Sequence, residues 1–210
     1  MAVDEALLES ISALGSPVLR FYGWTEPAAT FGYFQHYSDI AAWTKLRPLI
    51  RRPTGGGLVP HDADWTYSLV IPPNHEWYSL RAAESYLRLH EWLARALKAS
   101  GIPAEIAAAS RKEIPGQCFA GAEQYDILVA GRKIAGAAQR RAREGLLVQG
   151  SLQKLPINSD REAFQRQMLL NAAPAWDAQW EEWNLPPSIL ERADALAASK
   201  FSQDAHNQRR

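Results

Sequence analysis

The segment from Arg51 to Asp62 carries the residue types and spacing best suited to chemistry. It reads Arg51-Arg52-Pro53-Thr54-Gly55-Gly56-Gly57-Leu58-Val59-Pro60-His61-Asp62. Three successive glycines allow positive φ angles and a close approach of the backbone to a ligand. Their N–H groups can form an anion-binding concavity, and Arg52 adds a fixed charge with a fork of donors. The spacing matches neither a Walker A loop nor a dinucleotide-binding fingerprint. A flexible loop with solvated arginines is the alternative to a binding site.

A second segment places a lysine beside small residues at the start of an expected strand. It reads Gly131-Arg132-Lys133-Ile134-Ala135-Gly136-Ala137-Ala138-Gln139-Arg140. A lysine in this position can be partly desolvated and directed into a cleft, whereas a solvated turn lysine is the simpler interpretation. Gly136, Ala137 and Ala138 leave room for an acyl chain to lie against the sheet, although the close packing of a helix would also explain them.

Cys118 is the only cysteine and is a candidate nucleophile. Most single cysteines behave as small buried hydrophobes, but this one stands in the polar stretch Gly116-Gln117-Cys118-Phe119. A thiolate needs a lowered pKa, and a nearby ammonium such as that of Lys133 would supply it. One cysteine excludes an intramolecular disulfide framework, so we expect a reducing, cytoplasmic compartment.

The five histidines show no paired spacing typical of metal ligands, so we expect no metal site. His61 follows the glycine loop and is the only histidine that we link to a site. His90 is expected to be an ordinary mid-helix residue, and Asp62 and Asp64 are expected to shape a turn. The chain also has 8 Trp, which are more typical of core packing than of an apolar channel.

Length and charge exclude several classes of protein. The 210 residues suit one domain with a small appendage, and 23 basic against 23 acidic residues give a net charge of zero. A protein that reads nucleic-acid phosphates is usually basic, so we expect no nucleic-acid partner. No apolar run approaches the roughly 20 residues that span a bilayer, so we expect no membrane partner. The N-terminus also lacks the basic region of a secretory signal.

Hydrophobic periodicity predicts helices and strands that mix without strict alternation, which favours an α+β fold. Helices are expected over 1–14, 38–46, 160–170 and 188–201, with a further helix of about 20 residues capped by Ser79. Strands are expected over 18–24, from Leu49, over 65–71 and over 145–152, and a hairpin over 126–137 turns at Ala130-Gly131. We expect a catalytic domain over 1–155. A helical, Trp-rich extension over 156–210 would pack on it, with a frayed end from Asp204 to Arg210.

Taken together, these segments resemble the catalytic domain of the biotin/lipoate protein ligase superfamily, in its lipoate branch. The matching pieces cover roughly residues 1–155 in the family order: Met1–Leu8, Leu19–Trp24, Gly32-Tyr33-Phe34-Gln35, Arg51–Gly57, His61, Thr66–Ser68, Lys133–Gly136 with Gln139-Arg140, and Gln149-Gly150-Ser151. The resemblance implies mixed, mainly antiparallel β-sheets flanked by helices. The family strand that normally precedes the first helix is absent from this sequence, so we expect an unpaired sheet edge.

The resemblance implies a function in protein lipoylation. Cys118-Phe119, Tyr125-Asp126 and Gly131-Arg132-Lys133 resemble the cysteine loop of octanoyltransferases. Such enzymes take octanoate from acyl carrier protein as a cysteine thioester and pass it to a lysine of a lipoyl domain, without a cofactor. The acceptors are lipoyl domains of 2-oxoacid dehydrogenases or glycine cleavage proteins. Cys118 and Lys133 would be catalytic, and Arg52 would also steer the acidic partners. The expected substrate-binding residues are Tyr33, Arg52, Gly55, Gly56, Gly57, His61, Gly136, Ala137, Ala138, Gln149 and Gly150.

Two alternatives stay open at this point. An ATP-dependent lipoate ligase would act through lipoyl-AMP and need ATP and Mg²⁺, and Gly57 favours it because the transferases often carry arginine there. Tyr125 favours the transferase, because typical ligases carry an Asn-Asp pair where Tyr125-Asp126 stands. Gln149-Gly150-Ser151 departs from the His-Gly-Ser that is often found at the last strand. The second alternative is a non-catalytic module that binds an acyl ligand.

Overall fold

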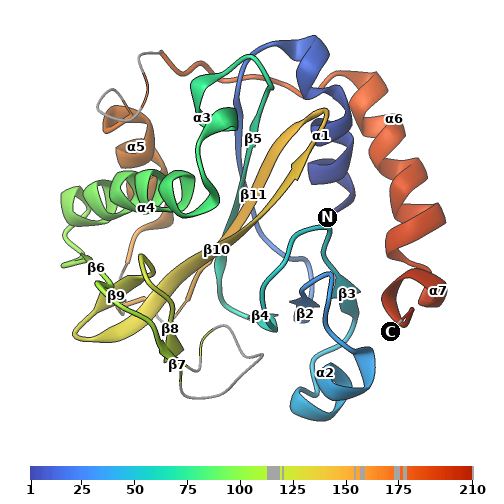
Figure 1. Cartoon of the computed structure of the whole chain (residues 1–210), viewed down its shortest axis with the longest axis horizontal. Helices are drawn as coiled ribbons and strands as arrows, with labels where there is room; N and C mark the ends of the chain where they lie inside the picture. The colour runs from blue at the N-terminus through green and yellow to red at the C-terminus, as the bar shows by residue number, and fades with distance from the viewer. Residues whose placement is uncertain are drawn as a thin grey trace.

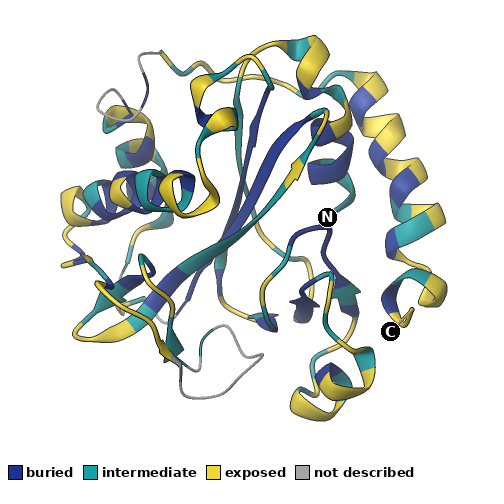
Figure 2. Cartoon of the chain, in the orientation of Figure 1, coloured by how far each residue is buried: buried dark blue, intermediate teal, exposed yellow. Residues whose placement is uncertain are grey.

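The computed structural model describes residues 1–112, 119, 121–153, 155–156, 159–172, 176 and 179–209. Six strands form the main sheet in the order β1-β5-β11-β10-β9-β6, and every neighbouring pair is antiparallel (Figure 1). The strands are β1 (Val18–Tyr22), β5 (Trp65–Ile71), β6 (Glu105–Ile106), β9 (Ile127–Val129), β10 (Arg132–Ala142) and β11 (Gly145–Leu152). The central strands β5 and β11 are buried over nearly their whole length (Figure 2).

Two smaller sheets accompany the main one. Strands β3 (Leu49–Arg51), β2 (Ala28–Phe31) and β4 (Val59–His61) form a three-stranded sheet in which β2 is parallel to β3 and antiparallel to β4. Helix α2 (Tyr37–Trp43) packs on this sheet through Ile40. Strands β7 (Arg111–Lys112) and β8 (Gly121–Ala122) form an antiparallel pair. These sheets confirm the predicted α+β class with mixed, mainly antiparallel pairing.

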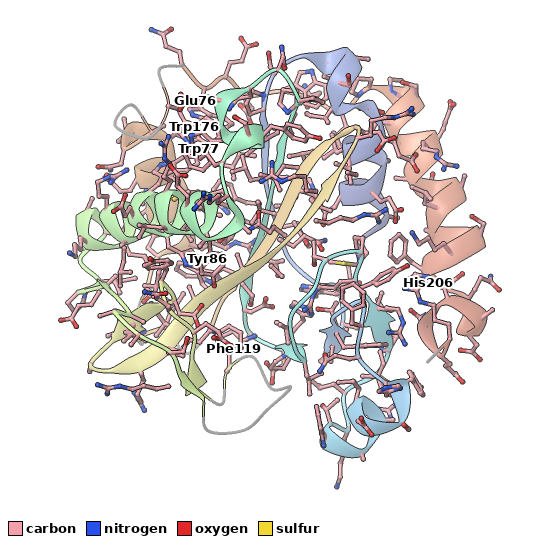
Figure 3. The ribbon with its side chains drawn as sticks, in the orientation of Figure 1. Glu76, Trp77, Tyr86, Phe119, Trp176 and His206 are labelled. Carbon is pink, nitrogen blue, oxygen red and sulfur yellow. The ribbon has the colours of Figure 1, made fainter. Side chains whose placement is uncertain are left out.

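One face of the main sheet is covered by α3 (Glu76–Ser79), α4 (Ala82–Ala99) and α5 (Arg161–Leu170) (Figure 1). The prediction that Ser79 caps the long helix is wrong. Ser79 ends α3, and Leu80 and Arg81 have extended ψ angles of 150° and 152° that separate it from α4. Tryptophans fill this core as expected: the rings of Trp77 and Trp176 stack with centroids 4.1 Å apart (Figure 3).

The other face is covered by α1 (Ala2–Leu14), on which α6 (Pro187–Leu196) packs (Figure 1). A π-helical turn (Ala197–Phe201) and α7 (Asp204–Asn207) then bring the chain back to β3. The predicted division at residue 155 stays a prediction. No helix in the described ranges is both long enough and apolar enough to cross a membrane.

The frayed end predicted from Asp204 to Arg210 is wrong for Asp204–Asn207. The backbone N–H of Arg51 donates to Asn207 Oδ1 at 3.0 Å, and the Arg51 guanidinium donates to the carbonyls of His206 and Asn207 at 3.2 and 3.0 Å. The polar composition that indicated fraying instead supplies acceptors for a fully buried arginine. Figure 3 labels His206 at this junction.

We predict that Asn207→Ala destabilises the protein. The change removes the acceptor of the buried Arg51 N–H, and an unsatisfied buried donor costs about 1–3 kcal/mol. The free energy of unfolding in urea measures the effect. Gln208→Ala, at an exposed neighbouring position, is the control. Equal stability of the two variants would contradict the anchoring role of Asn207.

A second prediction concerns the hairpin turn between β9 and β10. Val129 pairs with Arg132, and both residues between them have positive φ, 49° at Ala130 and 73° at Gly131, as in a type I′ turn. Alanine is disfavoured there and asparagine is preferred. Ala130→Asn should therefore raise the free energy of unfolding by about 1 kcal/mol, whereas the β-branched Ala130→Val should lower it. A loss of stability in Ala130→Asn would disprove the turn assignment.

Candidate functional site

The register of the central strands assembles segments that lie far apart in the sequence. Gly136–Ala138 of β10 pair with Gln149–Ser151 of β11, which pair in turn with Thr66–Ser68 of β5. An open pocket with an empty volume of about 470 Å³ lies here. The pocket is lined by residues of both larger sheets, of the glycine loop between β3 and β4, and of the chain just before α1 and just before β8: Met1, Tyr22, Thr30, Arg52, Gly56, Val59, His61, Thr66, Phe119, Lys133, Gly136, Ala137, Ala138, Gln149, Gly150 and Ser151.

Lys133 contributes a buried ammonium group to the pocket. Its Nζ lies 2.7 Å from Asp126 Oδ2, and the side chains of Lys133 and Asp126 are 7% and 0% exposed. The same carboxylate oxygen accepts the backbone N–H of Glu123 at 2.6 Å. Nζ also lies 5.0 Å from the ring centroid of Phe119, which Figure 3 places near β10. A buried charge is stable only when paired, so Asp126 is what allows a lysine at this position.

Two glycines line the pocket at positions where no larger residue fits. A Cβ on Gly136 would lie 2.9 Å from Lys133 Nζ and 2.9 Å from Asp126 Oδ1. A Cβ on Gly150 would lie 2.1 Å from the ring of Tyr67. Gly136 therefore makes room for the ion pair as well as forming a pocket wall.

The glycine loop is held in place by Arg52, whose predicted role in steering partner proteins stays a prediction. Its guanidinium donates to Thr30 Oγ1 at 2.9 Å and to the carbonyls of Gly55 and Gly57 at 2.8 and 2.9 Å. Arg52 is 5% exposed, and its charged group lies inside the protein, where it binds the loop and lines the pocket.

The loop also makes a close backbone contact that only glycine allows. Gly56 has a φ of 87°, in the left-handed region that glycine favours. A Cβ on Gly32 would lie 1.9 Å from the carbonyl oxygen of Gly56. The segment around Gly32 and Tyr33 thus packs directly against the glycine loop, and the N–H of Tyr33 donates to the carbonyl of Thr54 at 2.9 Å.

His61 and Asp64 form a buried polar chain at the pocket wall. His61 Nδ1 lies 2.8 Å from Asp64 Oδ2, and His61 Nε2 lies 2.8 Å from Thr30 Oγ1. Burial lowers the pKa of His61, although Asp64 opposes this. Burial alone would raise the pKa of Asp64, but hydrogen bonds from His61, Ser151 and Thr66 lower it. A neutral His61 therefore donates from Nδ1 to the Asp64 carboxylate and accepts at Nε2 from the Thr30 hydroxyl.

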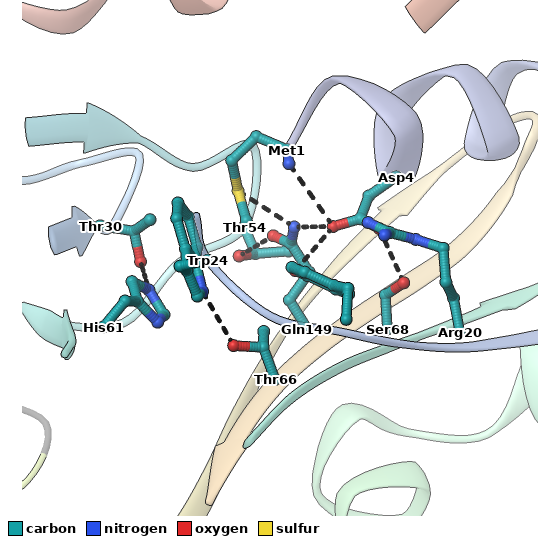
Figure 4. A network of polar contacts seen from close by, with 11 residues as sticks. Met1, Asp4, Arg20, Trp24, Thr30, Thr54, His61, Thr66, Ser68 and Gln149 are labelled. Atoms are coloured by element: carbon teal, nitrogen blue, oxygen red, sulfur yellow. Dashed lines mark hydrogen bonds and ion pairs between the residues drawn. The ribbon is translucent and has the colours of Figure 1, made fainter. Parts of the chain in front are cut away.

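Asp64 does more than the predicted shaping of a turn, since Thr66 and Ser151 also donate to it, at 2.8 and 2.7 Å. Trp24 covers the ring of His61, with centroids 4.1 Å apart, and donates to Thr66 Oγ1 at 2.9 Å (Figure 4). The result is a rigid wall whose polar atoms satisfy one another.

Gln149 connects the glycine loop to the first helix. Thr54 Oγ1 donates to Gln149 Oε1 at 2.8 Å, and Gln149 Nε2 donates to Asp4 Oδ2 at 2.7 Å and contacts Met1 Sδ at 3.3 Å (Figure 4). Asp4 is fully buried and also accepts from Arg20 and Ser68, each at 2.7 Å. The Gln149 amide is thus committed to internal contacts, although the residue lines the pocket.

The structure brings together most of the residues predicted for the site. The predicted residues among the pocket lining are Arg52, Gly56, His61, Lys133, Gly136, Ala137, Ala138, Gln149 and Gly150. Three predicted residues are outside the lining: Gly55, Gly57 and Tyr33. The carbonyls of Gly55 and Gly57 accept from Arg52, and the backbone of Tyr33 bonds to Thr54 and Arg51. Cys118 lies outside the described residues.

Sequence reasoning missed Asp126 and Tyr86. The spacing of Asp126 from Lys133 had no recognisable pattern, although a lysine expected in a cleft implies a buried carboxylate partner. Tyr86 falls within the predicted long helix, where its sequence neighbours give no sign of a polar role. In the described part of the chain, no group of three or more His, Cys, Asp or Glu side chains could hold a metal ion.

His90 is not the ordinary mid-helix residue that was predicted. It is fully buried, its Nδ1 lies 2.6 Å from the carbonyl of Tyr125, and its Nε2 has no hydrogen-bond partner among the described residues. Burial lowers its pKa to about 4, although Asp126 and Tyr125 oppose the shift. His90 is therefore neutral at neutral pH and resists protonation in the folded state.

This lowered pKa predicts a pH dependence of stability. The unfolded state binds a proton at His90 near pH 6.5, whereas the folded state does so only near pH 4, so stability falls as the pH drops below 6.5. Between pH 7 and pH 5 the loss through His90 is about 2 kcal/mol. Urea unfolding of wild type and His90→Gln measures it, and the variant should lose less stability over this range. His36→Gln, at an exposed histidine, is the control. Parallel pH profiles of wild type and His90→Gln would refute the assignment.

Comparison with known proteins gives a matching family model and similar proteins. The family model described as "Lipoyl protein ligase A/B catalytic domain" matches residues 1–175. Octanoyltransferase LipM of Carboxydothermus hydrogenoformans is 40% identical over 158 residues, covering 72% of this chain and 59% of that protein. Octanoyltransferase LipM of Moorella thermoacetica is 39% identical over 170 residues, covering 76% and 62%. The chain thus spans about three fifths of the length of these relatives.

Solved structures share the fold at low sequence identity. A lipoate-protein ligase A bound with ATP superimposes with a TM-score of 0.80 at 20% identity, covering 99% of this chain and 92% of that chain. A T. acidophilum protein with bound lipoic acid gives a TM-score of 0.81 at 20% identity, covering 100% and 92%. At this identity the likeness shows the fold alone.

Proposed function

We propose that this chain, which belongs to the lipoyl protein ligase A/B catalytic domain family, is an acyltransferase that passes an octanoyl group from acyl carrier protein to a lysine of a lipoyl domain. The observation that carries the proposal is the buried ammonium of Lys133 at a pocket wall made of Gly136, Ala137 and Ala138. Phe119 lies against this ammonium, and the residue that precedes it in the sequence is Cys118. Relatives at 39% and 40% identity that are named octanoyltransferases add support.

The first step in this proposal is transfer of the acyl group to the enzyme. The Cys118 thiolate attacks the thioester carbonyl of the donor, a new C–S bond forms, and the carrier's sulfur leaves as a thiolate that takes up the proton released by Cys118. The Lys133 ammonium favours the Cys118 thiolate and orients the acyl carbonyl. Backbone N–H groups of the glycine loop or of Gly136 would stabilise the oxyanion, at roughly 3 kcal/mol for each donor.

The second step forms an amide on the acceptor. The neutral lysine amine of a lipoyl domain attacks the Cys118 thioester, the C–N bond forms as the C–S bond breaks, and the amine proton ends on the cysteine sulfur. Conversion of a thioester to an amide is downhill, so the proposal requires no cofactor. A reactive thiol persists in a reducing compartment, and we therefore place the reaction in the cytoplasm.

Intact-mass spectrometry with octanoyl acyl carrier protein tests the proposal. We expect wild type to gain one octanoyl group without ATP, and Cys118→Ser to gain none, because a serine hydroxyl lacks the low pKa of an activated thiol. The chain has one cysteine, so a thioester adduct has a single possible site. Octanoyl-AMP or lipoyl-AMP formed only when ATP and Mg²⁺ are present would reject the transferase in favour of a ligase. Acyl binding without transfer would identify a binding module.

Lys133→Ala is predicted to lose acyl transfer to an apo lipoyl domain by at least about 100-fold, since the activating ammonium is gone. The same assay on Lys45→Ala, which removes an exposed ammonium, is the control. Thermal unfolding of both variants checks that the protein is folded. A Lys133→Ala variant with wild-type transfer would remove Lys133 from the reaction.

A further inference from the structure

Tyr86 on α4 joins the catalytic ion pair to the backbone of the main sheet. Its hydroxyl lies 2.5 Å from Asp126 Oδ1 and accepts the backbone N–H of Ala137 at 3.1 Å. Burial raises the pKa of Tyr86 well above its usual value, and the Asp126 charge adds to this. The phenol therefore keeps its proton and donates it to Asp126, while a lone pair receives the Ala137 N–H. Figure 3 shows Tyr86 between α4 and β10.

The second contact of Tyr86 lies at a gap in the sheet. Strand β9 pairs with β10 at Arg132, Lys133 and Ala135, and the register shifts between Lys133 and Ala135. Ala137 lies beyond the end of this ladder, and its partner on β11 is Gly150. The Tyr86 hydroxyl thus takes the place of a β9 carbonyl at the point where β10 becomes the pocket wall.

The two carboxylate oxygens of Asp126 accept hydrogen bonds from different donors. Oδ1 accepts from Tyr86, whereas Oδ2 accepts from Lys133 at 2.7 Å and from the Glu123 N–H at 2.6 Å. A carboxylate held at both oxygens cannot rotate without losing hydrogen bonds, and a flexible lysine bound to it has one preferred position. No side chain of Gly136 confines the ammonium, so hydrogen bonds must fix its place.

We propose that Tyr86 is a positioning residue that sets the place of the Lys133 ammonium in the pocket by fixing Asp126. The assignment rests on the proposed acyl transfer, in which the place of the ammonium decides how well the thiol is activated. Tyr86 is not among the residues that line the pocket, so it acts through Asp126. Its removal should reduce the maximal rate of acylation more than the affinity for the donor, since misplacement of a catalytic group by about 1 Å can cost on the order of 100-fold in rate.

The test measures single-turnover acylation by octanoyl acyl carrier protein, followed by intact mass. Tyr86→Phe should lower the maximal rate by about 10-fold or more, with the half-saturating donor concentration changed by less than about threefold. The matched control is Tyr78→Phe, because the Tyr78 hydroxyl donates to the Ala142 carbonyl of the same strand at 3.0 Å. Both variants lose a tyrosine hydroxyl bound to β10, and Tyr78→Phe should acylate at the wild-type rate.

A double variant tests whether Tyr86 acts through Asp126. Asp126→Asn alone should slow acylation, and adding Tyr86→Phe should cause little further loss, because residues that act as one unit are not additive. Independent, multiplying losses would overturn the proposal. Equal losses in Tyr86→Phe and Tyr78→Phe would overturn it too, since they indicate a general effect on β10.

The same assay separates the proposal from the function on which it rests. A wild-type protein that takes up no acyl group rejects the acyl-transfer function and this assignment together. Rapid acylation of both wild type and Tyr86→Phe rejects only the assignment.

Discussion

The pocket depends on one constraint, which is that the ammonium of Lys133 can be buried only beside a carboxylate. An isolated charge in an apolar wall is too costly to keep, and loss of one partner of a buried pair is strongly destabilising. Asp126 meets this need at 2.7 Å. The pairing requires β9 and β10 to be adjacent, because Asp126 immediately precedes β9 and Lys133 is the second residue of β10. The tight turn at Ala130-Gly131 is therefore part of the site, although it lies outside the pocket.

Close backbone approach is the second requirement, and glycine meets it at each contact. Gly32 lies under the carbonyl of Gly56, Gly136 lies against the Lys133–Asp126 pair, and Gly150 lies on the ring of Tyr67. Arg52 then fixes the glycine loop from its own side by binding the Gly55 and Gly57 carbonyls. The glycine-rich sequence suggests a flexible loop, but the buried Arg52 guanidinium holds the loop in one conformation. Its glycines allow that conformation and the close contacts that it makes.

The sequence predicts local elements and motifs well, because periodicity and turn residues are encoded locally. The first helix, the turn at Ala130-Gly131 and the α+β class all follow from such patterns. Long-range polar contacts cannot be predicted in this way, because they leave no local pattern in the sequence. Arg51 and Asn207 are 156 positions apart, and their bond turns a polar tail that reads as frayed into an anchored helix. Tyr86 and Asp126 are separated by 40 positions, and no local signal links them.

Backbone strain beside Asp126 explains why the site needs support from α4. Tyr125 has a φ of 73°, a left-handed value that costs a non-glycine residue of order 1–3 kcal/mol. Two contacts hold it there: its N–H donates to the Ala107 carbonyl at 2.8 Å, and its carbonyl lies 2.6 Å from His90 Nδ1. Asparagine tolerates this conformation better than tyrosine. The chain therefore has a costly backbone conformation next to its buried carboxylate. His90 and Tyr86 lie one helical turn apart on α4, with ring centroids 4.1 Å apart, and bind the Tyr125 carbonyl and the Asp126 carboxylate respectively.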